Sequence, residues 1–591
     1  MAAIWAALFL SNVGSDATEE ASCGLYLAFS DVFGRLGVFT RNELTKGTML
    51  NAQDIVVPLI EDEGPLWDDN RWSHLLGYVE WEGRAVRALN SGTGGAINVH
   101  STLYNVEPVL EADHAQSTGL HRKKDAGAGA FSYQVMKYVV TSSIPAGGQV
   151  LLRNLDSRRT ISDADYDVMD AAVETVGKML EDVPESHKEV FLRHVLKFAR
   201  SGMMASFSDT FPATPIQFQR AKDLGVAKSW TYDDSNVSPT WLVENGKCLD
   251  GIQYGASTID QAGRGAFASR PLKEGSVVVP APVIPISRFS LEKFEDDEHQ
   301  LLRNYCFGHF ASSLLLCPYG SPASYVNHAG SGRANVRMVW STTLDSKHEI
   351  WANKTVDEIL KNPEPGLVFD LVATRDIAEG EEILLDYGES WDEDWKRHLE
   401  WWEPPTDAQT YQSATELDQL LNSSHIRTDT EQSSDPYPQN VLVAARYQID
   451  RDTKPSLEEK RDRVTVKTYA YTAPQDTTTA ALMRGVHVVH VVQRKRGIFG
   501  GETYVVELLN HPLALTGDPQ YVKKTERIIV TGVPREVLHF VDAPYTSDHH
   551  LDNAFRCEIQ IPEEIFPAAW ADLMDGGDLH AGYGEPEDEE L

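Results

Sequence analysis

The sequence predicts a mainly β protein with helices, in which two related β-rich units are joined by a helical connector and followed by a third β-rich unit. Short apolar runs bounded by Gly, Pro and Asp clusters fill residues 24–155 and 245–403, a texture typical of strands and turns. Residues 160–210 change to helical spacing, and motifs of the first β-rich region recur in the second. The 591 residues are enough for about three to four domains. A hydrophobic content of 42% is ordinary for a globular chain and excludes wholesale disorder.

The helical connector is predicted from apolar residues that recur every three or four positions, the spacing of one helix face. These residues are Met169, Ala172, Val173, Val176, Met179 and Leu180. Ser162 precedes the run and is a suitable N-cap, because its hydroxyl can accept a hydrogen bond from a free backbone N–H of the first turn.

The ends of the chain and its last third give weaker patterns. Residues 404–440 are rich in Ser, Thr, Asp, Gln and Pro, which predicts a linker, and 441–573 alternate as a further β-rich domain. The acidic, Gly-rich residues 575–591 predict a disordered tail.

The apolar run within residues 1–17 could be a signal peptide, which would direct the chain to the secretory pathway. Without that signal, the nucleus or the cytoplasm is expected; no apolar run has the roughly 18 residues of a membrane span.

The charge and the cysteines limit the partners. With 53 basic and 88 acidic residues the net charge is −35, which repels a phosphate backbone, so no direct nucleic-acid binding is expected. The same charge would attract a basic, lysine-bearing polypeptide, although acidity can also serve solubility alone.

The five cysteines are odd in number and form no CxxC pair. This argues against a disulfide framework and a zinc cluster, although one pair could still form a bridge; no metal site is predicted.

Three segments of the second β-rich region form a constellation. The first is the Gly-rich turn Gly263–Phe267, the second is Tyr325–Ala329 with its Asn-His pair, and the third is Ile377–Gly388, which ends in Asp-Tyr-Gly. Each segment alone is common in turns and polar pairs. Their order and spacing together are far more specific, and with them the region resembles the SET domain of protein lysine methyltransferases.

The resemblance implies a SET-type β-clip fold over residues 245–403 and an S-adenosylmethionine-dependent protein-lysine N-methyltransferase. It implies that Tyr387 is the catalytic tyrosine at the methyl-transfer channel. The residues it implies for cofactor binding are Gly263, Arg264, Gly265, Ala266, Asn327, His328, Tyr387 and Trp391. The chain departs from the family pattern at Ala329 and Gly330, where Ser and Cys are frequent, and it lacks a cysteine-rich segment after the tyrosine.

These residue types suit that reaction. Asn327 can donate and accept hydrogen bonds, as the amino and carboxylate groups of a zwitterion require. A substrate lysine, with an ordinary pKa of about 10.4, must lose its proton before it attacks, and an apolar channel favours the neutral amine. Tyr387 could orient the lone pair of that amine, and the in-line geometry makes positioning a major source of rate.

The N-terminal region 24–155 echoes the same three segments. Phe39 precedes Phe267 by 228 residues, Asn98 precedes Asn327 by 229, and Asn154 precedes Tyr387 by 233. In this first copy Val99 stands where the second has His328, and Asn154 stands where the second has the tyrosine. The hypothesis is a degenerate, catalytically inactive SET-like domain that packs against the active copy or helps to hold the substrate.

Two other functions stay open. The whole chain could be a non-catalytic SET-like scaffold that binds protein partners, or the same fold could methylate a histidine or a small amine. The expected partner is a protein substrate with an accessible lysine; its identity and the degree of methylation do not follow from the sequence.

Overall fold

A computed structural model describes most of the chain, and every structural statement below concerns the residues that it describes. Helices make up 28% and strands 33%, so the prediction of a mainly β chain with helices is confirmed. The described residues are 23–59, 76–81, 84–111, 120–132, 135–153, 162–202, 210–291, 300–330, 332–344, 346–361, 366–421, 424–446, 454–461, 464–472, 486–496, 501–509, 526–543 and 554–573. The predicted signal peptide (1–17), the predicted tail (575–591) and Asn154 lie outside them.

The N-terminal unit (residues 23–153) contains two sheets. One has the order β10-β1-β2, and the other the order β4-β5-β3-β8-β7-β9-β6, in which β6 and β9 pair in parallel. The strands are β1 (Leu25–Ser30), β2 (Arg35–Thr40), β3 (Met49–Pro58), β4 (Leu76–Trp81), β5 (Arg84–Asn90), β6 (Asn98–Val99), β7 (Val106–Glu111), β8 (Val135–Val140), β9 (Leu151–Leu152) and β10 (Lys247–Cys248).

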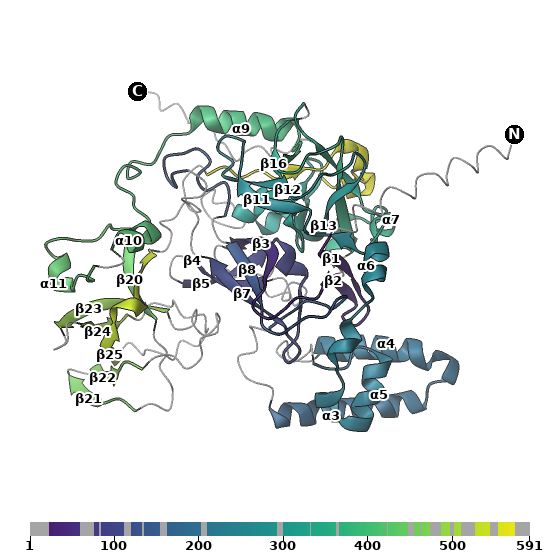
Figure 1. Ribbon diagram of the computed structural model, residues 1–591, viewed down its shortest axis with the longest axis horizontal. Helices are drawn as coiled ribbons and strands as arrows, with labels where there is room; N and C mark the ends of the chain where they lie inside the picture. The colour runs from purple at the N-terminus through teal and green to yellow at the C-terminus, as the bar shows by residue number, and fades with distance from the viewer. Residues whose placement is uncertain are drawn as a thin grey trace.

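The helical unit follows and packs at one end of the molecule (Figure 1). Its helices are α3 (Asp163–Glu181), α4 (Glu185–Gly202) and α5 (Pro215–Leu224), so helices continue beyond the predicted limit of residue 210. Helix α6 (Pro239–Asn245) follows and packs beside β1 of the N-terminal unit. Ser162 caps α3 in a reciprocal capping box with Asp165, which explains where the helix begins. The predicted face is correct at Met169, Val173 and Val176, which are buried; Met179 is exposed. None of the described helices is long and apolar enough to cross a membrane.

The central unit (residues 247–403) holds the predicted constellation. A four-stranded sheet has the order β11-β12-β19-β16, and a six-stranded sheet has the order β17-β18-β13-β15-β14-β27. The elements are β11 (Ile252–Ala256), β12 (Arg264–Ala268), β13 (Val277–Ser287), β14 (Phe307–Gly308), β15 (Leu314–Pro318), β16 (Asn327–His328), β17 (Val336–Trp340), α7 (His348–Trp351), α8 (Val356–Lys361), β18 (Leu367–Ala373), β19 (Glu382–Leu385) and α9 (Glu389–Trp401). Its core is continuous with Ile55, Val57 and Leu89 of the N-terminal unit, so the two units share buried apolar surface.

The C-terminal unit is a seven-stranded sheet of order β21-β22-β25-β24-β23-β20-β26. Its elements are α10 (Ala414–Leu421), α11 (Asp429–Gln432), β20 (Val441–Arg446), β21 (Leu457–Arg461), β22 (Val464–Ala470), β23 (Val486–Arg496), β24 (Glu502–Leu508), β25 (Glu526–Pro534) and β26 (Leu538–Asp542). Residues 404–440 do not form a free linker here, because Leu417, Ile426 and Tyr437 are buried in the core of this sheet. Ala414, Leu417 and Leu421 have helical spacing, but a helix of eight residues is too short to stand out in a segment rich in Ser, Thr and Gln.

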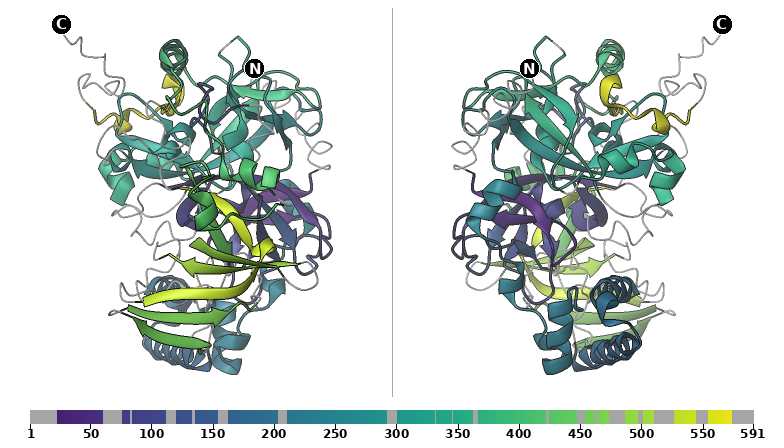
Figure 2. Two further views of the ribbon diagram at one scale, coloured as in Figure 1. Left: turned by 90° about the vertical axis from the view of Figure 1, so that its left-hand side faces the viewer. Right: turned by 90° about the vertical axis from the view of Figure 1, so that its right-hand side faces the viewer.

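The last described residues leave this sheet and return to the central unit. Strand β27 (Ile559–Gln560) pairs in parallel with β14, and Trp570 is buried in the central core. Figure 2 shows this yellow segment beside the central unit, apart from the C-terminal sheet. The predicted domain 441–573 is therefore divided in the structure, and we call residues 554–573 the return segment.

Two disulfide bonds are present, Cys23–Cys248 and Cys306–Cys317, and Cys557 is a free thiol. The sequence-based argument against a disulfide framework is wrong at this point. An odd total leaves room for two pairs, and the partners are 225 and 11 residues apart, so only the fold brings them together.

A buried ion cluster holds the return segment. The Glu558 carboxylate accepts hydrogen bonds from Arg288 and from Arg303, the latter at 2.8 Å, and the Arg288 side chain is only 1% exposed. Although burial by itself would raise its pKa, the two guanidinium groups lower the pKa of Glu558 to about 2.

We predict that Glu558→Gln lowers the free energy of unfolding at pH 7 by about 3 kcal/mol, because two buried cations lose their charged partner. The folded pKa of Glu558 lies below its unfolded value, so its contribution is complete above about pH 4.5 and is lost as the pH falls toward 2. The melting-temperature difference between wild type and variant should therefore be larger at pH 7 than at pH 3. The exposed Glu564→Gln is the matched control, and equal melting temperatures of wild type and Glu558→Gln at pH 7 would contradict the prediction.

Candidate functional site

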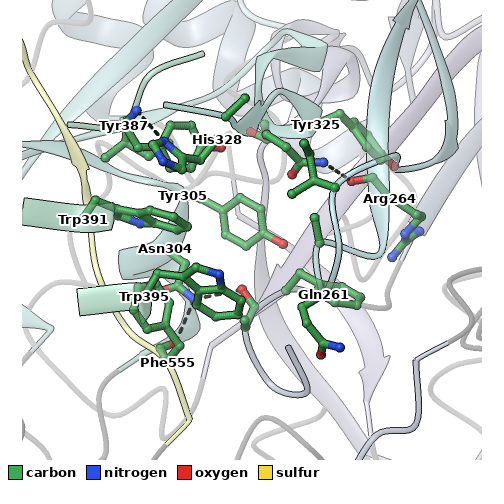
Figure 3. Close-up of a pocket in the computed structure, with 18 of the residues that line it drawn as sticks. Gln261, Arg264, Asn304, Tyr305, Tyr325, His328, Tyr387, Trp391, Trp395 and Phe555 are labelled. Atoms are coloured by element: carbon green, nitrogen blue, oxygen red, sulfur yellow. Dashed lines mark hydrogen bonds between the residues drawn. The ribbon is translucent and has the colours of Figure 1, made fainter. Parts of the chain in front are cut away.

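A cavity of about 420 Å³ lies where the central unit, the N-terminal unit and the return segment meet (Figure 3). Of the residues predicted from the sequence, Arg264, Asn327, His328, Tyr387 and Trp391 line it. Gly263, Gly265 and Ala266 do not; they lie in the turn and strand behind it. The fold therefore brings the three predicted segments to one cavity, with the glycines in a supporting position.

Parallel pairing of β16 with β19 sets the register of the site. Asn327 lies opposite Leu384 and His328 lies opposite Leu385, so both residues are carried at the end of a short, well-defined ladder. The Asn335 side chain fixes this ladder further by donating to Glu382 O and accepting from Leu384 N, each at 2.8 Å. The Asn335 side chain thus satisfies one buried carbonyl and one buried N–H, which explains why position 335 is an asparagine.

Gly263 and Gly265 of the Gly-rich turn are required for different reasons. Gly263 has φ +70°, a conformation that a residue with a Cβ rarely adopts, and a Cβ there would lie 2.6 Å from the Phe131 ring. A Cβ on Gly265 would lie 2.2 Å from Glu382 Oε1. Gly265 thus makes room for a glutamate side chain, whereas the resemblance implied a part in cofactor binding. Ala266 is fully buried opposite Ile383.

Asn327 joins the two sides of the site. Its Nδ2 donates to Arg264 O at 2.8 Å (Figure 3) and to Ser257 Oγ at 3.1 Å. Among the described residues, none donates a hydrogen bond to its side-chain oxygen. The asparagine therefore holds the Gly-rich turn with its amide nitrogen and keeps an acceptor for a ligand.

His328 is a neutral imidazole. Its Nδ1 accepts a hydrogen bond from Tyr387 N at 2.9 Å, so the ring proton is on Nε2, 3.5 Å from Asp392 Oδ1. Burial lowers the pKa of His328, and this exceeds the opposite effect of Asp386 and Asp392. The histidine thus adds no positive charge to the cavity at neutral pH.

Tyr387 presents a protonated hydroxyl. It donates a hydrogen bond to Val326 O, and burial raises the pKa of Tyr387 well above its usual value. Because its proton is used by the backbone, the oxygen is left as an acceptor toward a ligand. Gly388 follows with φ +101° and turns the chain into α9.

Helix α9 contributes an aromatic wall. Trp391 lies 4.7 Å from the His328 ring and 5.0 Å from the Tyr387 ring, between ring centroids. Trp395 stacks on Trp391 at 5.9 Å because residues four apart share one helix face. Phe555 of the return segment packs edge-on against both tryptophans, at 5.2 and 4.9 Å.

Several lining residues were missed in the sequence analysis. They are Phe131, Ser132, Tyr305 and Phe555. Tyr325 and Trp395 also line the cavity; Tyr325 belongs to the Asn-His segment and Trp395 lies one helical turn beyond Trp391, so local spacing points to both. No local pattern marks the others, since they come from segments distant in the sequence.

The Gly-rich turn, the Asn-His segment and the Asp-Tyr-Gly segment fall within one family match. Residues 263–388 match the family model of the SET domain. A search of curated proteins gives no match.

Three solved structures show partial similarity. A Plasmodium falciparum protein assigned as a histone methyltransferase is 19% identical, with 22% of this chain and 93% of that chain covered and a TM-score of 0.16. An active polycomb repressive complex 2 in its basal state is 20% identical, with 27% of this chain and 17% of that chain covered and a TM-score of 0.18. The Chaetomium thermophilum polycomb repressive complex 2 is 20% identical, with 29% and 18% covered and a TM-score of 0.19.

The match includes Arg264, Asn327, His328 and Tyr387 of the cavity lining, whereas Trp391 lies just beyond it. The chain therefore carries a SET domain over residues 263–388.

Proposed function

We propose that the protein is an S-adenosylmethionine-dependent protein-lysine N-methyltransferase whose site is the cavity in the SET domain. The observation that carries the proposal is the convergence of Arg264, Asn327, His328, Tyr387 and Trp391 on one cavity of about 420 Å³. A volume of this order suits a cofactor-sized ligand. Bound S-adenosylmethionine would supply an electrophilic methyl group.

The polar groups of the cavity fit such a ligand. Ser324 Oγ and Tyr325 OH are buried and have no hydrogen-bond partner among the described residues, and both residues line the cavity. Unpaired buried polar groups are costly, so a ligand that pairs with them gains affinity. The Asn327 oxygen, also without a donor, suits the ammonium group of the methionine part, and the Trp391 ring suits a planar base.

The apolar part of the lining suits a lysine side chain that must react as a neutral amine. Phe131, Ile55 and Phe307 line the cavity and disfavour an ammonium ion there. Because the Tyr387 proton is donated to Val326 O, the Tyr387 oxygen can accept a hydrogen bond from the amine and hold its lone pair toward the methyl carbon. We propose a basic polypeptide as the substrate, since the net charge of −35 favours such a partner.

We also propose that residues 24–155 are a degenerate copy of the SET-like unit. Asn98 Nδ2 donates to Leu36 O at 3.1 Å, as Asn327 Nδ2 donates to Arg264 O, and each asparagine lies on a short strand paired in parallel with the closing strand. Asn105 and Asn335 also correspond. Each side-chain amide donates to a backbone carbonyl of the closing segment and accepts from the backbone N–H that lies two residues after that carbonyl. The partners are Gln149 and Leu151 for Asn105, and Glu382 and Leu384 for Asn335.

The first copy differs where a cofactor would bind. Arg35 Nε donates to Asn98 Oδ1, so the acceptor that is available in Asn327 is used here by the protein's own cation. The Trp230 ring packs 4.8 Å from His100, directly after the β6 strand, and 5.5 Å from Phe33. These contacts support a structural role for the first copy and a cofactor site in the second alone.

We predict that wild type binds S-adenosylmethionine saturably in isothermal titration calorimetry. Asn327→Ala should weaken binding about tenfold to a hundredfold, because an acceptor for the ammonium group is lost. Asn98→Ala is the matched control, since it removes the same kind of bond in the first copy, and it should leave the affinity unchanged. Loss of binding in Asn98→Ala would contradict the inactive first copy, and absence of binding by a folded wild type would favour the non-catalytic scaffold.

We predict that Tyr387→Phe reduces kcat on a lysine-bearing protein substrate by about a hundredfold or more, because the lone pair of the amine loses its orienting partner. The dissociation constant for S-adenosylmethionine should change little, since the ring and its contact with Trp391 remain. Turnover equal to wild type would exclude Tyr387 as the catalytic residue. Amino-acid analysis of the labelled product should give methyl-lysine; methyl-histidine would instead point to the alternative chemistry.

A further inference from the structure

We propose that residues 127–132 of the N-terminal unit are a wall of the cofactor cavity, with Phe131 and Ser132 as positioning residues for the SET domain. This inference rests on the proposed function. It assigns to the N-terminal unit a direct part in ligand binding that the SET domain, residues 263–388, does not itself contain.

Ser132 connects two residues that line the cavity. Its backbone N–H donates to the Tyr305 hydroxyl at 2.8 Å, and its carbonyl accepts from Arg264 Nη2 at 2.6 Å. The Ser132 hydroxyl donates to Val56 O at 2.6 Å, which connects this residue to β3. The backbone of a single residue of the N-terminal unit therefore positions both Tyr305 and Arg264.

The bond to Tyr305 also sets the polarity of that hydroxyl. One lone pair accepts from the Ser132 N–H, and no acceptor for the Tyr305 proton is present among the described residues. The Tyr305 ring lies in the middle of the cavity wall in Figure 3. Tyr305 is thus left as a donor toward a ligand, whereas Tyr387 is left as an acceptor.

Phe131 supports the Gly-rich turn. Its ring fills the space that a side chain at Gly263 would need, and it also lines the cavity. The turn carries Arg264 O, the acceptor of the Asn327 amide. Removing the ring would leave an apolar hole beside the turn, and the turn and Asn327 would lose a defined position.

The backbone of the segment is held on the other side by residues near the cavity. Asn304 Nδ2 donates to Ala130 O at 2.8 Å, Arg556 donates to Gly129 O, and Gly127 N donates to Gln261 Oε1 at 3.0 Å. Burial of these polar backbone groups without such partners would be costly, so the segment is specified in this place. The wall is therefore a built part of the cavity.

The test uses the full chain and titrates S-adenosylmethionine by calorimetry into wild type, Phe131→Ala, Phe131→Leu and Phe33→Ala. Phe33 is the matched control, because it is a partly buried phenylalanine of the same unit that packs on Trp230, outside the lining of the cavity. We expect Phe131→Ala to weaken binding about tenfold or more, Phe131→Leu to restore most of the affinity, and Phe33→Ala to bind as wild type. Thermal unfolding of each variant shows that it is folded at the temperature of the titration.

The outcomes separate this inference from the proposed function. If wild type binds and Phe131→Ala binds equally well, or Phe33→Ala loses as much affinity, the wall is overturned while the proposed function stands. If Phe131→Ala does not fold, Tyr305→Phe takes its place: it removes the acceptor of the Ser132 N–H, and unchanged affinity in it overturns the inference. If folded wild type does not bind, the proposed function fails and this inference fails with it.

Discussion

The side-chain amide of Asn304 connects three parts of the chain, and the closure of the cavity depends on it. Its Nδ2 donates to Ala130 O and Phe555 O, at 2.8 and 2.9 Å, and its Oδ1 accepts from Cys557 N at 2.8 Å. One side chain thus pairs with two carbonyls and one N–H between packed segments, and Phe555 O also accepts from Arg556. A SET domain alone would leave its cavity open where these segments now lie.

The return segment makes this arrangement stable. The Glu558 carboxylate, between Arg288 and Arg303, pairs charges that could not be buried singly, and β27 adds main-chain bonds to the central sheet. Because Phe555 lies three residues before Glu558, the same anchor holds the aromatic wall against Trp391 and Trp395. Structural stability and the shape of the candidate site therefore have a common origin.

His328 and Tyr387 add no charge to the cavity, although Asp260, Arg264, Arg333 and Asp392 also line it. His328 is neutral because its Nδ1 accepts a backbone N–H, and Tyr387 keeps its proton because burial disfavours the phenolate. In the N-terminal unit the comparable position is closed by a protein cation, Arg35 on Asn98, and by the Trp230 ring. The proposed difference between the two units is therefore one of available hydrogen-bonding groups, while the backbone bonds that shape them are similar.

The sequence by itself determined the class of fold and the central constellation. Each of the three segments meets a local requirement. Gly263 must adopt a positive φ, and Asn327-His328 must pair with the strand that precedes Tyr387. Such requirements act on consecutive residues and can therefore be recognised in the sequence. It also indicated the face of α3, because helix periodicity is local.

Only the tertiary structure decided that Phe131, Tyr305 and Phe555 share the cavity and which cysteines pair. It also decided that 404–440 pack on a sheet and that 554–573 return to the central unit. These contacts join segments up to about 430 residues apart, and they follow from burial and hydrogen-bond satisfaction across the whole molecule, which no window of neighbouring residues contains.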